Sequence, residues 1–138
     1  MSALFLVAAL SIEFIGPCSV KPLLQSNVSG EFPHVGAVTV STLDRFEVDY
    51  AGNEAGLNSV FGTPTGMQAM EVISDTEMRS YGWCFDVDGR LPEEFPDHVS
   101  LQGVRHVRWF FGFAHYLNGQ WVSQCEPAYK VKPAFLCQ

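Results

Sequence analysis

Basic residues are scarce in this sequence. Eight Lys and Arg stand against 15 Asp and Glu, which gives a formal net charge of −7. Binding to nucleic acid depends on a cationic surface that releases counterions from phosphates, and binding to an anionic membrane surface needs the same kind of charge. The scarcity therefore argues against both partners, whereas a net negative charge helps to keep a small domain soluble.

Metal-ligand motifs are also lacking. The four cysteines include no Cys-x-x-Cys pair, so a structural zinc site has little support. The four histidines share no short spacing that would place two of them together. We therefore expect neither a metal nor a cofactor.

The acidic residues do not complete a recognised site. Asp86 and Asp88 lie on one face of a predicted strand, with Cβ atoms about 7 Å apart. Such a pair suits acid–base chemistry in principle, but a solvated strand that leads into a turn is the commoner reason for it. With Glu93 and Glu94 the pair resembles the start of a calcium loop, yet the later acidic positions lack the required spacing.

A thiol enzyme is the remaining catalytic alternative. It would use Cys84 or Cys125 as the nucleophile and His106 or His115 as the base. A cysteine held in a disulfide cannot serve this role, because the thiolate is the reactive species. We expect a protein that is not an enzyme.

No apolar run in the sequence reaches the roughly 20 residues that cross a bilayer comfortably. Leu4–Leu10 reads LFLVAAL, and the run continues around Glu13 to Ile15. A run of this length is typical of a secretory signal, and Ala9-Leu10-Ser11 offers a pattern of small residues for cleavage. The alternative is that Leu4–Ile15 forms a buried strand or helix of the fold.

Export sets the expected domain organisation. We predict a signal segment over residues 1–17, a Pro- and Gly-containing linker over residues 18–34 and one domain over residues 35–138, in a protein that is periplasmic or associated with the cell surface. Within export, Cys18 is a candidate for lipidation, although Pro17 fits a lipoprotein signal poorly because the peptidase must cut the bond after it.

Export also favours disulfides. Cys84 lies in a predicted strand, whereas Cys125 and Cys137 lie in a tail after the last strand. A disulfide from the sheet to this tail would constrain an otherwise loose end. We favour Cys84–Cys125 over Cys125–Cys137, and buried or unpaired thiols remain the alternative.

Alternation of apolar and polar residues predicts most of the secondary structure. The predicted strands are Val35–Ser41, Phe46–Tyr50, Tyr81–Val87, Val104–Tyr116 and Gln120–Ser123. Turns are expected at Asp88-Gly89 and Asn118-Gly119, because these residue types tolerate positive φ.

One helix is expected between the second and third of these strands. Thr65 is a candidate N-cap, and Met67, Met70 and Ile73 recur at a spacing of three residues, which predicts an apolar face on a helix ending near Arg79. The order of elements favours an α+β fold of β-grasp type, in which one helix crosses a mostly antiparallel sheet.

Two segments resemble a known family. Gly82–Gly89 reads GWCFDVDG, and Val107–Gly112 reads VRWFFG about twenty residues later. A strand of the form Gly-Trp-x-x-x-Val-x-Gly before a strand with a central Trp resembles the transcobalamin carboxy-terminal-like domain of unknown function. The resemblance implies a β-grasp fold, export or surface anchoring, and binding without catalysis.

The aromatic residues supply the candidate binding surface. The three tryptophans are Trp83, Trp109 and Trp121, and Trp is enriched at binding surfaces. If Trp109 faces the core, alternation turns a stripe of His106, Arg108 and Phe110 to the opposite side. This stripe is either a binding surface or the floor on which the carboxy-terminal tail packs.

The sequence therefore predicts an exported, non-catalytic binding module for a partner protein or a small ligand. Its candidate contacts are the three tryptophans and the stripe, and no nucleic acid is expected as a partner. A structural envelope lipoprotein, attached to the membrane only through a lipid on Cys18, is the alternative, and a small thiol-dependent enzyme is a further one.

Overall fold

The computed structural model describes residues 9–137 and has an α+β fold with one α-helix. A six-stranded sheet has the order β2-β1-β7-β6-β5, and β8 pairs with β7 outside this path. The helix is α1 (Val35–Arg45), and β3 and β4 form a separate hairpin. The strands are β1 (Leu10–Ile15), β2 (Leu24–Val28), β3 (Tyr50–Asn53), β4 (Gly56–Val60), β5 (Met70–Ser74), β6 (Glu77–Val87), β7 (His106–Leu117) and β8 (Gln120–Pro127). Three short 3₁₀ turns complete the chain: η1 (Gly66–Ala69), η2 (Pro96–His98) and η3 (Ala128–Lys130).

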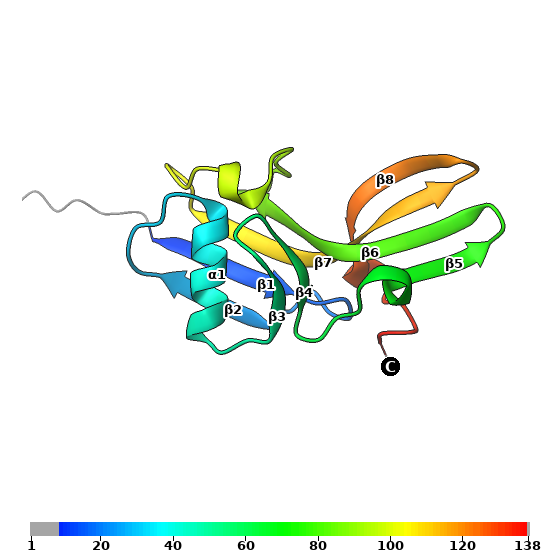
Figure 1. The fold of residues 1–138 in the computed structure, drawn as a ribbon, viewed down its shortest axis with the longest axis horizontal. Coiled ribbons are helices and arrows are strands. Elements are labelled where there is room, and N and C mark those ends of the chain that lie inside the picture. Colours follow the sequence, from blue (N-terminus) through cyan, green and yellow to red (C-terminus); the bar gives the residue numbers. More distant parts are fainter. Residues whose placement is uncertain (1–8, 138) are drawn as a thin grey trace, which may run out of the picture.

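Strand β7 is the centre of the sheet. It pairs antiparallel with β6 from Val107 to Leu117, and its other edge is shared by β1 and β8. The β1–β7 pairing is parallel, whereas β1 pairs with β2 as an antiparallel hairpin. Figure 1 shows α1 at the end of the molecule that holds β1 and β2, with β5 and β8 at the other end.

The amino-terminal segment corrects the expected domain boundaries. Leu10–Ile15 is β1, between β2 and β7, and the side chains of Ile12 and Phe14 are fully buried. A signal segment ending at residue 17 would remove this strand from the core, and residues 18–34 are not a linker because they contain β2. Residues 1–8, which hold the first part of the expected signal, lie outside the described residues.

The prediction of a strand over Val35–Ser41 is wrong, because these residues begin α1. The His34 ring caps the helix by accepting a hydrogen bond from the Ala37 N–H at 3.0 Å. Inside the helix, the Thr39 hydroxyl donates to the carbonyl of Val35, four residues earlier, at 2.7 Å. The β-branched run thus remains helical because its buried face packs on the sheet and its hydroxyls bond within the helix.

The predicted helix from Thr65 to Arg79 is also absent. A 3₁₀ turn, η1, leads directly into β5, and a tight turn then starts β6 at Glu77. Met67 is 89 % exposed and Val72 is 73 % exposed, so the expected apolar stripe faces solvent. The Ser74 hydroxyl accepts a hydrogen bond from the Thr76 N–H, which favours a hairpin turn over a continued helix.

The central strands and their turns are confirmed. Tyr81–Val87 lies within β6, Val104–Tyr116 corresponds to β7, and β8 extends the predicted last strand to Pro127. The turn residues Asp88 and Asn118 have φ angles of 50° and 51°, and each is followed by a glycine with φ of 83°. The second predicted strand, Phe46–Tyr50, is wrong, because β3 starts only at Tyr50.

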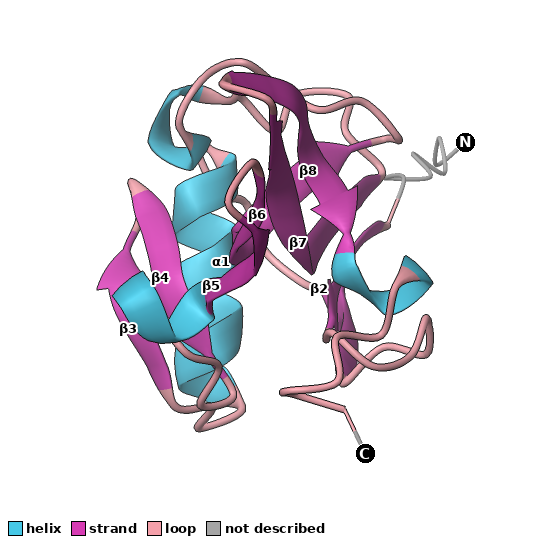
Figure 2. Cartoon of the chain, turned by 90° about the vertical axis from the view of Figure 1, so that its right-hand side faces the viewer, coloured by secondary structure: helices cyan, strands magenta, loops and turns pink. Residues whose placement is uncertain are grey.

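The core has two parts. One lies under α1 and includes Ile12, Phe14, Val38 and Trp109. The other lies where the carboxy-terminal tail packs on β6 and β7, and it contains Tyr81, Phe111, Phe113 and Ala128. Figure 2 shows the carboxyl end on the opposite side of the molecule from the β3–β4 hairpin.

Both pairs of cysteines form disulfides, and none is free within the described residues. Cys84–Cys125, the favoured pair, is confirmed. The second bond joins Cys18 to Cys137, which was not among the predicted pairs. Lipidation of Cys18 is thereby contradicted, because its sulfur is already bonded. No helix within residues 9–137 has the length and apolar character of a membrane span.

Candidate functional site

A cavity with a volume of about 520 Å³ lies beside strand β6. Small-molecule pockets commonly have volumes of about 300–1,000 Å³. Three segments form its walls: the β3–β4 hairpin, strand β6 and the connection between β6 and β7. The side chains of Leu57, Trp83, Phe85, Leu91, Phe95 and Trp109 provide most of its apolar lining. Glu94 is the only charged residue among those that line it.

The hairpin wall is fixed to the rest of the fold at both ends. At its tip the Glu54 carbonyl packs so closely on Gly36 of α1 that a Cβ atom there would overlap it. After β4, the Thr63 hydroxyl accepts a hydrogen bond from the Trp83 indole N–H at 2.8 Å. The cavity is therefore bounded by anchored segments, and a ligand would meet a largely pre-formed surface.

The outer wall exposes large apolar side chains. Leu91 is 52 % exposed and Phe95 is 68 % exposed, and both lie in the connection between β6 and β7. This connection is anchored by η2 and by the Val99 carbonyl, which accepts a hydrogen bond from the Val35 N–H at the start of α1. Exposed apolar residues at the mouth of an apolar cavity are typical of a binding site.

The inner wall is a strand edge without a neighbouring strand. Strand β5 pairs with β6 only as far as Ser80. At the other end of β6, the Val87 N–H and carbonyl both bond to Arg90, away from β7. Along an antiparallel strand, the N–H and carbonyl of successive residues point alternately toward one neighbouring strand and toward the other. Trp83 and Phe85 lie four and two residues before Val87, so their main-chain groups also point away from β7. In the part of the chain that the structure describes, no strand pairs with them on that side.

The predicted stripe of His106, Arg108 and Phe110 lies on the opposite face of the sheet, but it is not an exposed aromatic surface. Phe110 is only 3 % exposed, and its ring lies against Gly112, which the Glu126 carbonyl of β8 approaches closely. Arg108 lies 5.8 Å above the Phe110 ring. The carboxy-terminal part of the chain therefore helps to cover this face.

The charged groups of the stripe are paired. The Arg108 guanidinium donates to the buried carboxylate of Asp86 at 2.7 Å. Ion pairs of this kind satisfy a charge that burial would otherwise destabilise. The Asp88 carboxylate accepts the His106 N–H at 2.9 Å, which closes the turn after β6. Asp86 and Asp88 are therefore occupied with structural contacts.

His106 joins two side chains of β1. Its Nδ1 lies 2.7 Å from the Ser11 hydroxyl, and its Nε2 lies 3.0 Å from the Glu13 carboxylate. A neutral ring fits both contacts when Nε2–H donates to Glu13 and Nδ1 accepts from Ser11. The hydroxyl, imidazole and carboxylate are arranged in the order of a serine hydrolase triad. However, Ser11, His106 and Glu13 do not line the cavity. The Ser11 N–H already donates to the Arg105 carbonyl and does not provide an oxyanion donor. We interpret the group as a clamp between β1 and β7.

The three tryptophans lie in different places. Trp109 is buried, and its indole N–H donates to the Thr39 hydroxyl of α1 at 2.8 Å. Trp83 is half-buried in the wall of the cavity, and Trp109 contributes to the cavity floor. Trp121 is 50 % exposed on β8 and packs edge-on against Tyr116. The structure thus brings Trp83 and Trp109 together and leaves Trp121 apart from them.

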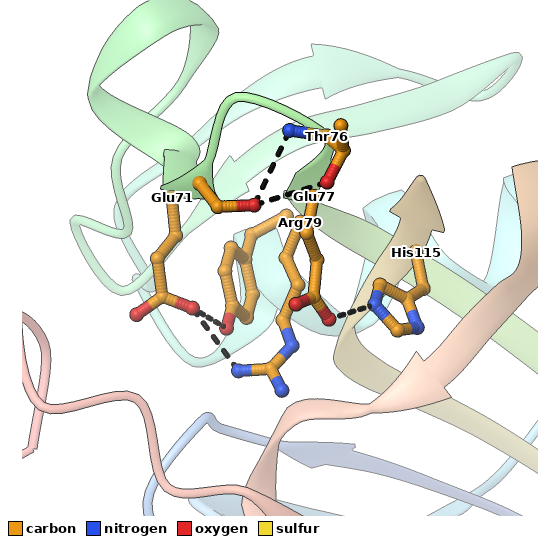
Figure 3. Close-up of polar contacts among 7 residues, drawn as sticks. Glu71, Thr76, Glu77, Arg79 and His115 are labelled. Atoms are coloured by element: carbon orange, nitrogen blue, oxygen red, sulfur yellow. Dashed lines mark hydrogen bonds and ion pairs between the residues drawn. The ribbon is translucent and has the colours of Figure 1, made fainter. Parts of the chain in front are cut away.

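A second polar group fixes the far end of the sheet, where β5, β6 and β7 meet (Figure 3). The Glu71 carboxylate accepts from Arg79 at 3.1 Å and from the Tyr81 hydroxyl at 3.2 Å. Burial and the neighbouring Glu71 carboxylate raise the pKa of Tyr81 above its usual value of 10.0. Glu77 and His115 form a further contact at 2.7 Å between β6 and β7. These contacts tie strands together, and none of their residues lines the cavity beside β6.

The outer wall of the cavity has only a weak signal in the sequence. Leu91 and Phe95 lie in a stretch that contains prolines and acidic residues, a composition typical of a surface connection. Two large apolar residues in such a connection were the available signal. Within residues 9–137, no three His, Cys, Asp or Glu side chains gather as metal ligands would.

Comparisons with known proteins do not identify a relative: no family model, no curated protein and no solved structure matches the chain.

Proposed function

We propose that this protein is an exported, non-catalytic binding module whose site is the cavity beside β6. The observation that carries the proposal is an apolar cavity of about 520 Å³ with exposed Leu91 and Phe95 at its mouth. Few polar groups converge in it, and those present are suited to orienting a ligand rather than to transforming it. A thiol-dependent reaction has no support, because all four cysteines are paired.

Export and the β-grasp type belong to the same proposal. Disulfides persist in oxidising compartments, so the pairs Cys18–Cys137 and Cys84–Cys125 support export. A β-grasp fold is supported by the β1–β2 hairpin, the helix that follows it and the parallel pairing of β1 with β7. Membership of the transcobalamin carboxy-terminal-like family is supported by the two segments that carry the resemblance, which form most of β6 and part of β7.

A fluorescent apolar probe tests the proposed site. We expect N-phenyl-1-naphthylamine to bind the oxidised full chain with increased emission and to quench Trp83, which lies in the cavity wall. Phe95→Ala should weaken this binding about 5- to 10-fold, because it removes a large apolar contact. Val122→Ala is the matched control, since Val122 is 53 % exposed on β8 outside the cavity. Equal weakening by both variants, or no binding at all, would contradict the proposal.

A further inference from the structure

We infer that the occupant of the cavity is an extended, cationic polypeptide segment that adds to β6 as a further strand. This inference rests on the proposed function and specifies the class of partner. Its first support is the free strand edge: Trp83 and Phe85 line the cavity, and each directs an N–H and a carbonyl away from β7, where no described strand pairs with them. Main-chain groups in this arrangement bind peptides by strand addition, a mode that supplies affinity through hydrogen bonds.

The spacing of these groups defines the length of the partner segment. Two strand residues whose main-chain groups point to the same side are about 7 Å apart, so a segment that pairs with both Trp83 and Phe85 must span at least three residues. The edge is bounded at one end by Thr63, which holds the Trp83 indole, and at the other by the Val87–Arg90 turn. These main-chain groups can pair with a short extended segment but not with a helix, whose own main-chain groups are bonded within it.

The cavity lining defines the side chains of the partner. Trp83 and Phe85 both point to the α1 side of the sheet, where Leu57 and Trp109 complete an apolar surface. A residue of the added strand that lies beside them has to be apolar, because cross-strand neighbours on one face pack together. Since side chains alternate along a strand, the partner has apolar residues at every second position.

The charge around the cavity indicates which residues the partner segment has between its apolar residues. Glu94 is the only charged residue in the cavity lining, and Glu93 next to it is also exposed. The whole chain carries a formal charge of −7. Complementary charge increases the rate of association and selects among partners. An alternating segment with Lys or Arg between its apolar residues matches these features, whereas an acidic segment is repelled.

A matched set of peptides tests the inference on the oxidised full chain. The probe is a blocked decapeptide of alternating Lys and Val, and its controls are an alternating Glu–Val peptide and a Lys–Val peptide N-methylated at two consecutive central valines, whose amides point to the same side of the strand. N-methylation should weaken binding about 30-fold, because each main-chain hydrogen bond contributes about 5-fold. In amide-exchange NMR, the Trp83 and Phe85 amides should gain protection on binding, whereas the Cys84 amide, which points to β7, should not change.

The outcomes separate this inference from the proposed function. Binding of Lys–Val with loss on N-methylation and protection at Trp83 and Phe85 supports strand addition. Equal binding of the methylated peptide overturns strand addition, and tighter binding of Glu–Val overturns the cationic class. If the naphthylamine probe binds and no peptide does, the polypeptide partner is overturned while the proposed site stands. If neither binds, both proposals fail.

Discussion

Truncation of Phe14 is the sharpest test of the amino-terminal strand. Its side chain is fully buried in β1, beneath α1 and beside β7. Replacement of a buried Phe by Ala costs about 3–5 kcal/mol, from lost transfer free energy and from the cavity left behind. Because a domain has a free energy of unfolding of about 5–15 kcal/mol, Phe14→Ala removes a large part of the total.

Urea unfolding of the oxidised full chain, followed by circular dichroism, measures this loss. With a slope of about 2 kcal/mol per molar urea, the midpoint should fall by about 2 M. The melting temperature should fall by about 10–20 °C. Val20→Ala is the control in the same part of the chain, because Val20 is 60 % exposed and should change stability by less than about 0.5 kcal/mol. A change below about 1 kcal/mol for Phe14→Ala would refute the placement of β1 in the core.

Further predictions concern the covalent and polar contacts. Opening Cys18–Cys137 by a double Cys→Ser change should destabilise the fold by about 2–5 kcal/mol, measured by the same urea titration, because it frees the unfolded chain over a separation of 119 residues. Arg108→Met should cost about 3–5 kcal/mol at pH 7, since it leaves the Asp86 carboxylate buried without a partner, and Asp86→Asn in the same background should recover part of the loss. Absorbance at 295 nm should show tyrosine titration above pH 10.0 that becomes smaller in Tyr81→Phe, and the part that remains includes Tyr50, whose pKa is raised by its hydrogen bond to Asp44. Because the pKa of Tyr81 is raised in the folded state, the stability it contributes is complete below pH 10.0 and is lost as pH rises through the raised value.

The parts of the fold that the sequence predicts well are those in which local pattern and tertiary environment agree. Tyr81–Val87 alternates strictly because one face lies in the core, and the Asp88-Gly89 and Asn118-Gly119 turns use residues that accept positive φ. The predicted Cys84–Cys125 pairing is confirmed, but Cys125 lies in β8 and not in a loose tail, so the bond joins two strands of the sheet.

The parts that the sequence predicts poorly are those in which neighbours decide between two local choices. Val35–Ser41 has the β-branched composition of a strand, yet Val35, Val38, Thr39 and Thr42 have the spacing of one helix face, and contact with the sheet selects the helix. The three-residue spacing from Met67 to Ile73 has no such partner surface, and the strand edge of β6 recruits Met70–Ser74 as β5 instead.

In the candidate site, too, some features follow from the local sequence and others depend on distant parts of the chain. Composition singles out Trp83 and Trp109 as candidate contacts, and both line the cavity, whereas the cavity itself depends on the β3–β4 hairpin, which no short-range pattern places beside β6. The free edge at Trp83 and Phe85 exists only because β5 ends its pairing at Ser80. Long-range placement of this kind is set by the fold and has no signature in the neighbouring residues.

The Cys18–Cys137 bond has a mechanical consequence. It joins positions close to the two ends of the described chain, so nearly all of the fold lies within one covalent ring. Tension applied between the ends would act on β1, which precedes Cys18, and would then pass through the sulfur–sulfur bond, so that it bypasses α1 and the strands from β2 to β8. A single proteolytic cut between the two cysteines would leave both fragments attached to each other. All the segments that line the cavity beside β6 lie inside this ring, so they would remain covalently linked after such a cut.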